Sequence, residues 1–390
     1  MDISYETHFK SNRPDGRSYQ TMAAFMEQLR RTEPELAMPE NLDKEGFLVW
    51  QKKVKEKARE LLCLPEFTEQ PQPVLLDTVQ RQGYRVERWE FYPDDVTAVP
   101  VLMLIPDEAS AENPVPGVFC CPGSVASKEF IAGEPLLSPP HCQFSKHPDR
   151  ARMAKYYVEN GMVAVAFDNP ATAECDIEGV PRPQLCHGLL QNGLNYMGIS
   201  VFQKLCFLQF FKTLPFVDTD RLALSGHSLG AGVELFLALL CDDFKLMIHN
   251  ECASMHRDRY RSLTESVEGN ISHNIGIWHI IPGQFKYFQN PDLLAALAPR
   301  CLALNEGGPD VAIEKIKRAY EICGHPERLQ VSHYPKYMDE KDRKHPGELP
   351  KYGMSADDFE EYFYMDSPDH SFRREPALRF VNKWFFGKDE

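Results

Sequence analysis

One segment constrains the fold of this chain more than any other: Leu222–Gly232, which reads LALSGHSLGAG. It contains the pattern Gly-x-Ser-x-Gly at Gly226–Gly230, in which a serine occupies a sharp turn between a strand and a helix. The glycines of such a turn let two backbone segments pass closely. The context agrees, because an apolar run over 221–224 precedes the motif and a helical apolar run, Val233–Leu240, follows it. The motif predicts that Ser228 is a nucleophile.

A nucleophilic serine needs a general base, and the base needs an acid that orients it. With this motif the chain order is serine, acid, histidine. Downstream, an apolar strand over 301–304 runs into a Gly-rich turn with two acids, Glu306 and Asp310. We predict Asp310, at the end of the turn, as the acid, and Glu306 remains the alternative. His370 lies in a loop just before a helical segment over 375–386, so it is the predicted base.

These residues resemble the α/β-hydrolase superfamily, and within it the branch of acetyl xylan esterases and dienelactone hydrolases. The resemblance covers roughly residues 75–388, and its local matches are 118–129, 216–228, 298–310 and 369–372. It implies a mostly parallel central sheet with helices on both faces. It also implies a serine esterase that uses no metal and no organic cofactor. Dienelactone hydrolases usually have a cysteine nucleophile, whereas position 228 is serine.

The resemblance further implies an oxyanion hole made of two backbone N–H groups. One comes from the last residue of a His-Gly-x loop after the third central strand, and Pro122-Gly123-Ser124 is the equivalent here. Ser124 therefore inherits that role, and Leu229, directly after the nucleophile, supplies the second donor. The departure is Pro122, which replaces the usual histidine and has no N–H of its own.

The chain is expected to have two parts. Residues 1–72 form a helical extension that packs on the core, with apolar residues at helical spacing around 22–29 and 47–62, and contact with a second subunit stays open. Residues 73–390 form the catalytic domain, where strands alternate with helices, the largest helical segment being Leu190–Leu214. The predicted strands are 75–80, 84–92, 99–105, 118–121, 163–168, 222–225, 246–250, 301–304 and 329–334, and the early ones are expected to pair antiparallel at one edge.

Two connections are too long to serve only as links, and we expect them to shape a pocket. The first runs over 123–147. The second is an insertion of about 251–299 between the nucleophile and the acid, and it holds Trp278, Phe285 and Tyr287. Aromatic faces suit both acyl groups and sugars, so these three are the candidate substrate-binding residues, with a core of the insertion as the alternative reading.

Composition excludes several classes of function. The chain has 390 residues, 43% of them hydrophobic, and a net charge of −14, without the clustered basic residues that nucleic acid binding needs. No apolar run of about 18 residues predicts a membrane span, and no signal segment is recognised at the start. Eleven scattered cysteines favour reduced thiols and a cytoplasmic location. His325, His333 and His345 lie in a charged stretch that is expected to be a solvated loop, and their spacing does not fit a zinc site.

The sequence thus predicts a serine esterase acting on short-chain carboxylic esters. By the resemblance, its substrate carries acetyl groups on carbohydrate of the xylan type. A general carboxylesterase or peptidase of the same fold is the alternative, and a catalytically silent binding protein is the alternative from another class. The expected partner is a small-molecule or oligosaccharide ester, and the oligomeric state stays open.

Overall fold

The computed structural model describes residues 14–15, 33–68, 71–135, 151–177, 179–254, 276–345 and 356–388. The predicted helical spacing around 22–29 lies outside these ranges. So do residues 136–147 of the first long loop and 255–275 of the insertion.

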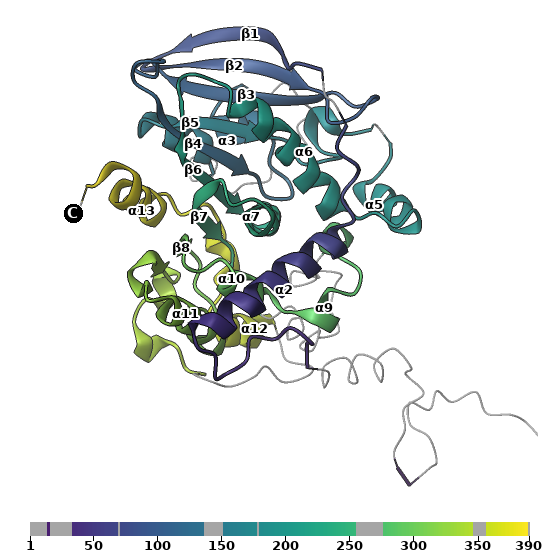
Figure 1. The fold of residues 1–390 in the computed structure, drawn as a ribbon, viewed down its shortest axis with the longest axis vertical. Helices are drawn as coiled ribbons and strands as arrows, with labels where there is room; N and C mark the ends of the chain where they lie inside the picture. The colour runs from purple at the N-terminus through teal and green to yellow at the C-terminus, as the bar shows by residue number, and fades with distance from the viewer. Residues whose placement is uncertain are drawn as a thin grey trace, which may run out of the picture.

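A nine-stranded sheet forms the centre of the molecule, in the order β1-β2-β3-β5-β4-β6-β7-β8-β9 (Figure 1). Its strands are β1 (Val74–Arg81), β2 (Tyr84–Phe91), β3 (Val99–Pro106), β4 (Val115–Cys121), β5 (Val163–Phe167), β6 (Val217–His227), β7 (Phe244–Asn250), β8 (Cys301–Leu304) and β9 (Leu329–Val331). Strands β1 to β3 pair antiparallel, and β3 joins β5 antiparallel. All pairs from β5 through β4 to β9 are parallel. Each predicted strand is found, with the antiparallel ones at one edge.

On strand β5 the two faces of the sheet carry side chains of different size. On β5, Val165 and Phe167 point into the larger core, whereas Ala164 and Ala166 point to the opposite face. Alternation with a period of two puts successive side chains on opposite faces. At this strand the small residues therefore face α4 (Met153–Glu159), and the large ones belong to the larger core.

Helices cover both faces. The larger core packs α2 (Lys44–Leu62), α6 (Tyr196–Phe211), α7 (Leu229–Leu240), α10 (Asn290–Ala295) and α11 (Asp310–Cys323) against the sheet. The opposite face carries α3 (Lys128–Ala132), α4 (Met153–Glu159) and α13 (Arg374–Phe386). The other α-helices in the described parts of the chain are α5 (Arg182–Gln191), α9 (Gln284–Tyr287) and α12 (Ala356–Phe363). No helix among the described residues is both long and apolar enough to span a bilayer.

The predicted helical segment Leu190–Leu214 is not one helix, which corrects the sequence-based expectation. Helix α5 ends at Gln191, and α6 begins only at Tyr196. Gly193 has a φ of 75°, a left-handed conformation that interrupts a helix. Asn195 then caps α6, because its side chain accepts a hydrogen bond from the N–H of Gly198.

Helix α2 belongs to the segment expected to extend the catalytic domain at its N-terminal side. One stripe of this helix, comprising Phe47, Trp50, Val54, Ala58 and Leu62, is buried in the larger core. The helix begins at a cap in which Asp43 accepts from the N–H of Gly46. Figure 1 shows α2 crossing the helical layer diagonally, below the antiparallel strands.

Candidate active site

Ser228 occupies a strained turn between β6 and α7. Its φ of 54° and ψ of −119° lie outside the regions that L-residues ordinarily adopt. The turn leaves no room for side chains on either side of it. A Cβ on Gly226 would lie 2.4 Å from the carbonyl oxygen of Gly230, and a Cβ on Gly230 would lie 1.9 Å from that of Cys121. The glycine pattern seen in the sequence thus has a steric cause, and such backbone strain is typical of functional sites.

The loop after β4 packs against this turn, as the predicted oxyanion hole requires. A Cβ on Gly123 would lie 3.5 Å from the Cβ of Ser228. Ser124 follows Gly123 directly, and Leu229 is the first residue of α7. Among the residues that the structure describes, none accepts a hydrogen bond from the N–H of Ser124 or Leu229. Both groups therefore keep their donor capacity for a ligand.

His370 lies in the loop between η9 (Ser367–Asp369) and α13. This loop reaches the carboxyl ends of the parallel strands, where the Ser228 turn also lies. Its Nδ1 lies 3.0 and 3.1 Å from the two carboxylate oxygens of Glu306. The Glu306 side chain is fully buried, whereas that of His370 is 27% exposed. A buried carboxylate on Nδ1 fixes the imidazole tautomer, in which Nε2 is the nitrogen that can accept a proton.

The prediction that Asp310 orients this histidine is wrong in the structure, because Glu306 occupies that position. Glu306 comes two residues after β8 and stays at the edge of the sheet. Gly307 and Gly308, with φ of 61° and 151°, then turn the chain away. Asp310 becomes the first residue of α11, where its carboxylate accepts from Tyr364 at 3.4 Å and lies 3.7 Å from the Nε of Arg343. A carboxylate is stabilised there by the helix dipole.

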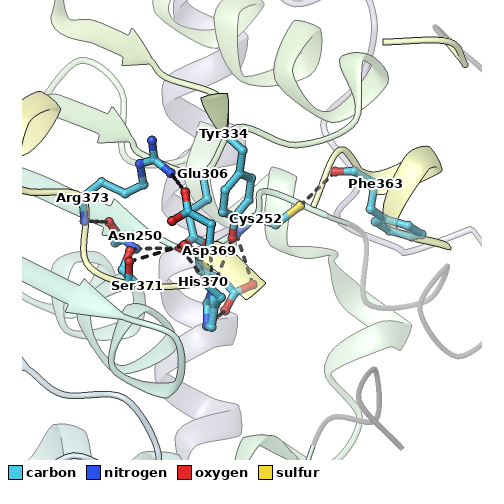
Figure 2. A network of polar contacts seen from close by, with 10 residues as sticks. Asn250, Cys252, Glu306, Tyr334, Phe363, Asp369, His370, Ser371 and Arg373 are labelled. Atoms are coloured by element: carbon cyan, nitrogen blue, oxygen red, sulfur yellow. Dashed lines mark hydrogen bonds and ion pairs between the residues drawn. The ribbon is translucent and has the colours of Figure 1, made fainter. Parts of the chain in front are cut away.

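Asn250, the last residue of β7, contacts the nucleophile turn, the acid and the loop that carries the base, and Figure 2 shows its contacts with Glu306, Ser371 and Arg373. Its backbone oxygen accepts from the N–H of Ser228 at 3.1 Å. Its Nδ2 donates to Glu306 at 2.9 Å and to the carbonyl of Ser371 at 3.1 Å. Its Oδ1 accepts from the N–H of Arg373 at 2.8 Å. Asn250 thereby fixes the loop that carries the histidine, a role that the sequence did not reveal.

Tyr334 completes the polar surroundings of the histidine. Its hydroxyl lies 3.4 Å from Nδ1 of His370, and the side chain is fully buried (Figure 2). Burial, with Glu306 and Glu251 nearby, raises the pKa of this phenol far above its usual value, so it stays protonated. When the Nδ1–H group of His370 donates to Glu306, Nδ1 cannot accept a hydrogen bond from Tyr334. The Tyr334 hydroxyl must then donate to another acceptor.

Tyr334 ends the predicted strand 329–334 and also belongs to the charged stretch of His325, His333 and His345. The expectation that this stretch is a solvated loop is wrong at Tyr334, which is buried. Tyr334 and Tyr337 are buried and form a small cluster with Tyr364. Of the three histidines noted in this stretch, His325 pairs with Glu327 and His345 stacks on Tyr362. The packing of these three tyrosine rings explains why this part of the stretch is buried, although charged residues surround the tyrosines in the sequence.

His227 and Glu251 both lie near the base. The His227 ring centroid is 4.7 Å from that of His370, and Oε2 of Glu251 is 4.0 Å from Nε2 of His370. Among the described residues, His227, Glu306 and His370 are also the one group whose metal-ligating atoms lie within 4.8 Å of one another. Glu306 and His370 are already hydrogen-bonded to each other through the carboxylate and Nδ1.

His227 gives the protein a predictable response to acid. Burial, reinforced by the neighbouring His370, lowers the pKa of His227 from 6.5 to about 3. Between about pH 6.5 and pH 3 the unfolded chain therefore binds a proton that the folded protein does not bind. The free energy of unfolding accordingly decreases as the pH is lowered through this window. We expect His227→Gln to reduce the loss of Tm between pH 7 and pH 4 by a few degrees. Thermal unfolding followed by circular dichroism at both pH values measures this.

The exposed His187, changed to glutamine, is the control for this experiment. Its substitution should leave the difference between the two melting temperatures as it is in the unaltered protein. If His227→Gln loses as much Tm between pH 7 and pH 4 as the unaltered protein does, a group other than His227 causes the loss of stability in acid.

The predicted substrate-binding residues occupy different surroundings. Trp278, in η5 (Ile277–His279), stacks with the guanidinium of Arg182 at 4.4 Å. The same guanidinium donates to the carbonyl of Ser124 at 2.6 Å, so contacts connect Trp278 to the loop after β4. Tyr287, at the end of α9, instead meets the ammonium group of Lys57 on α2 at 4.4 Å. Phe285 is half-buried on the same short helix.

Comparisons with known proteins identify the family and the fold. The family model described as the Abhydrolase family matches residues 4–383. A solved structure from Bacteroides fragilis, described as a candidate acetyl xylan esterase, is 32% identical, with a TM-score of 0.88 over 96% of this chain and 97% of that one. Among curated proteins no match is found.

More distant structures share the fold. A methylesterase has a TM-score of 0.58 at 15% identity, over 94% of this chain and 68% of that one. A glucuronoyl esterase from Solibacter usitatus has a TM-score of 0.52 at 14% identity, over 75% and 86% of the two chains. With the sheet order and the serine turn, the family match establishes the class: the chain belongs to the Abhydrolase family, has the α/β-hydrolase fold and is a carboxylic ester hydrolase.

Proposed function

We propose that this protein is a serine esterase that removes acetyl groups from carbohydrate through an acyl-enzyme on Ser228. The observation that carries the proposal is the contact of 3.0 Å between Nδ1 of His370 and Glu306, at the sheet edge where the serine turn lies. The acetyl and carbohydrate parts are supported by the similarity to the Bacteroides fragilis protein and by the resemblance of the motifs.

The mechanism follows from the roles of these groups. Nε2 of His370 takes the hydroxyl proton as Oγ of Ser228 attacks the ester carbonyl, while Glu306 stabilises the imidazolium. The N–H groups of Ser124 and Leu229 bind the oxyanion of the tetrahedral intermediate. The C–O bond to the alcohol then breaks, and His370 returns the proton to the departing alcohol. Water, activated by the same base, hydrolyses the acyl-enzyme and releases the acid.

A side-by-side substrate panel tests the proposal. Acetylated xylo-oligosaccharides, p-nitrophenyl acetate and a chromogenic peptide are incubated with the full chain, and kcat/KM is measured for each. We expect both acetyl esters to be cleaved and the oligosaccharide to have the lower KM. Cleavage of the peptide alone would contradict the proposal. Cleavage of p-nitrophenyl acetate but not of the oligosaccharide would indicate a general carboxylesterase.

The length of the acyl chain provides a further prediction. Trp278 is connected to the oxyanion loop through Arg182, and we expect the insertion to crowd the acyl side of the site. Each methylene that cannot enter weakens transition-state binding by roughly 1–3 kcal/mol. Therefore kcat/KM should fall steeply from p-nitrophenyl acetate through the butyrate to the octanoate. A flat or rising series would indicate an open, lipophilic acyl pocket.

A further inference from the structure

Asn169 holds the start of the loop that carries the predicted oxyanion donor. Asn169 follows β5 and is fully buried. Its Nδ2 donates to the carbonyl oxygens of Pro122 and Gly123, at 3.1 Å each. One amide nitrogen has two hydrogens, so both of its donors are used on two successive peptide groups.

The chemistry of the site fixes the orientation of this amide. Its Oδ1 is buried and has no hydrogen-bond partner. If the amide were rotated, Oδ1 would face two carbonyl oxygens, and three acceptors would meet without a donor. Nδ2 must therefore face the loop.

The neighbouring residue holds the other end of the same loop. Asp168 accepts from the backbone N–H of Lys128, the first residue of α3, at 2.7 Å, and from its ammonium group at 2.8 Å. The Lys128 side chain is fully buried and also meets Glu129 at 2.7 Å. Two adjacent residues after β5 thus fix both ends of the loop from 122 to 128. The hydroxyl of Thr172 in turn donates to the carbonyl of Asn169 at 2.7 Å.

Peptide geometry connects this anchor to catalysis. The carbonyl of Gly123 and the N–H of Ser124 belong to one planar trans peptide unit, so they point in opposite directions. Holding the carbonyl toward Asn169 directs the N–H of Ser124 away from it. Gly123 packs against Ser228. We propose that Asn169 is a positioning residue, which orients the Ser124 N–H toward the oxyanion. The inference rests on the esterase mechanism proposed above.

This role compensates for the departure seen in the sequence. The loop has proline where related enzymes are expected to have histidine, and Pro122 offers only a carbonyl to hold it. Asn169 uses that carbonyl. Arg182 holds the carbonyl of Ser124. That carbonyl belongs to the next peptide unit, so Arg182 sets the direction of the N–H of residue 125 and not of the Ser124 N–H.

Asn169→Asp tests the proposal, because it keeps the size of the side chain and removes both donors. A misdirected oxyanion donor should weaken transition-state binding by less than complete loss of one, which lowers rates about 10²–10³-fold. We expect kcat for p-nitrophenyl acetate to fall about 10- to 100-fold. KM should change less than threefold, and the affinity for a trifluoromethyl ketone, which forms a tetrahedral adduct, should fall in parallel with kcat. A purely structural role would not couple these two losses.

The matched control is Asn192→Asp, at an exposed asparagine whose Nδ2 donates to the carbonyl of Gly188. Its kcat and inhibitor affinity should equal those of the unaltered protein. If Asn169→Asp does not fold, Asn169→Ser decides, since its shorter side chain cannot hold both carbonyls and should lower kcat in the same pattern. Unchanged kcat in a folded Asn169 variant overturns the inference. An unaltered protein without esterase activity would instead overturn the proposed function.

Discussion

Ser228→Ala is expected to abolish ester hydrolysis, with kcat for p-nitrophenyl acetate falling about 10⁶-fold, as serine hydrolases lose when the nucleophile is removed. The reason is that no other hydroxyl occupies the strained turn between β6 and α7. A fluorophosphonate should label one site in the unaltered protein and none in the variant, and mass spectrometry of the labelled peptide identifies that site.

Ser225→Ala is the matched control for this experiment. Ser225 lies on the same strand, but it is fully buried, and its hydroxyl contacts Tyr157 at 3.0 Å on the face away from solvent. We expect the Ser225 variant to retain labelling at Ser228, although it loses some thermal stability. Labelling at another serine, or full activity of Ser228→Ala, would show that the turn does not supply the nucleophile.

The elements that the sequence predicted well are those with local causes. Strand β5 and the part of β6 over 222–225 are short, mainly apolar runs, and the glycines on both sides of Ser228 mark the turn in the sequence. Their steric meaning is visible in the structure, because neither Gly226 nor Gly230 could carry a side chain. His370 was found because its place in the chain order and on a loop before the last helix is also a local feature.

The positioning residues have no local signal. Asn250, Tyr334 and Asn169 act through contacts with segments distant in sequence, and an asparagine or tyrosine after a strand is ordinary in itself. Asn250, for example, contacts Glu306 and Ser371, which lie 56 and 121 residues away. Such residues become visible only when the sheet brings the ends of its parallel strands together, where α/β proteins place their ligands.

The prediction of Asp310 as the acid was wrong, and the physical reason cannot be seen in the sequence alone. Glu306 and Asp310 lie four residues apart on one Gly-rich turn, and either could reach a histidine if the turn allowed it. The left-handed conformations of Gly307 and Gly308 decide the matter. A Cβ on Gly308 would lie 2.6 Å from the carbonyl oxygen of Ala253, so the turn is also packed tightly against the segment after β7.

Glu306→Gln is therefore expected to lower kcat about 10⁴-fold, the loss that an amide in place of the triad acid causes in a serine protease. The amide keeps the size of the side chain but carries no charge to stabilise the imidazolium. Its nitrogen can also face Nδ1, which would then become an acceptor and leave Nε2 protonated. Steady-state kinetics with p-nitrophenyl acetate at pH 7 measure the loss, and the rate of fluorophosphonate labelling should fall with kcat.

Asp310→Asn is the internal control, since it makes the same chemical change four residues further along the chain. It should keep kcat within a few fold, because its carboxylate meets Tyr364 and Arg343 and not the histidine. Its effect should appear in Tm, as the loss of a partly exposed ion pair of modest strength. The reverse pattern, a mild Glu306→Gln and an inactive Asp310→Asn, would restore Asp310 as the acid. It would require the Gly307–Gly308 turn to rearrange during catalysis, because the present turn directs Glu306 alone to Nδ1 of His370.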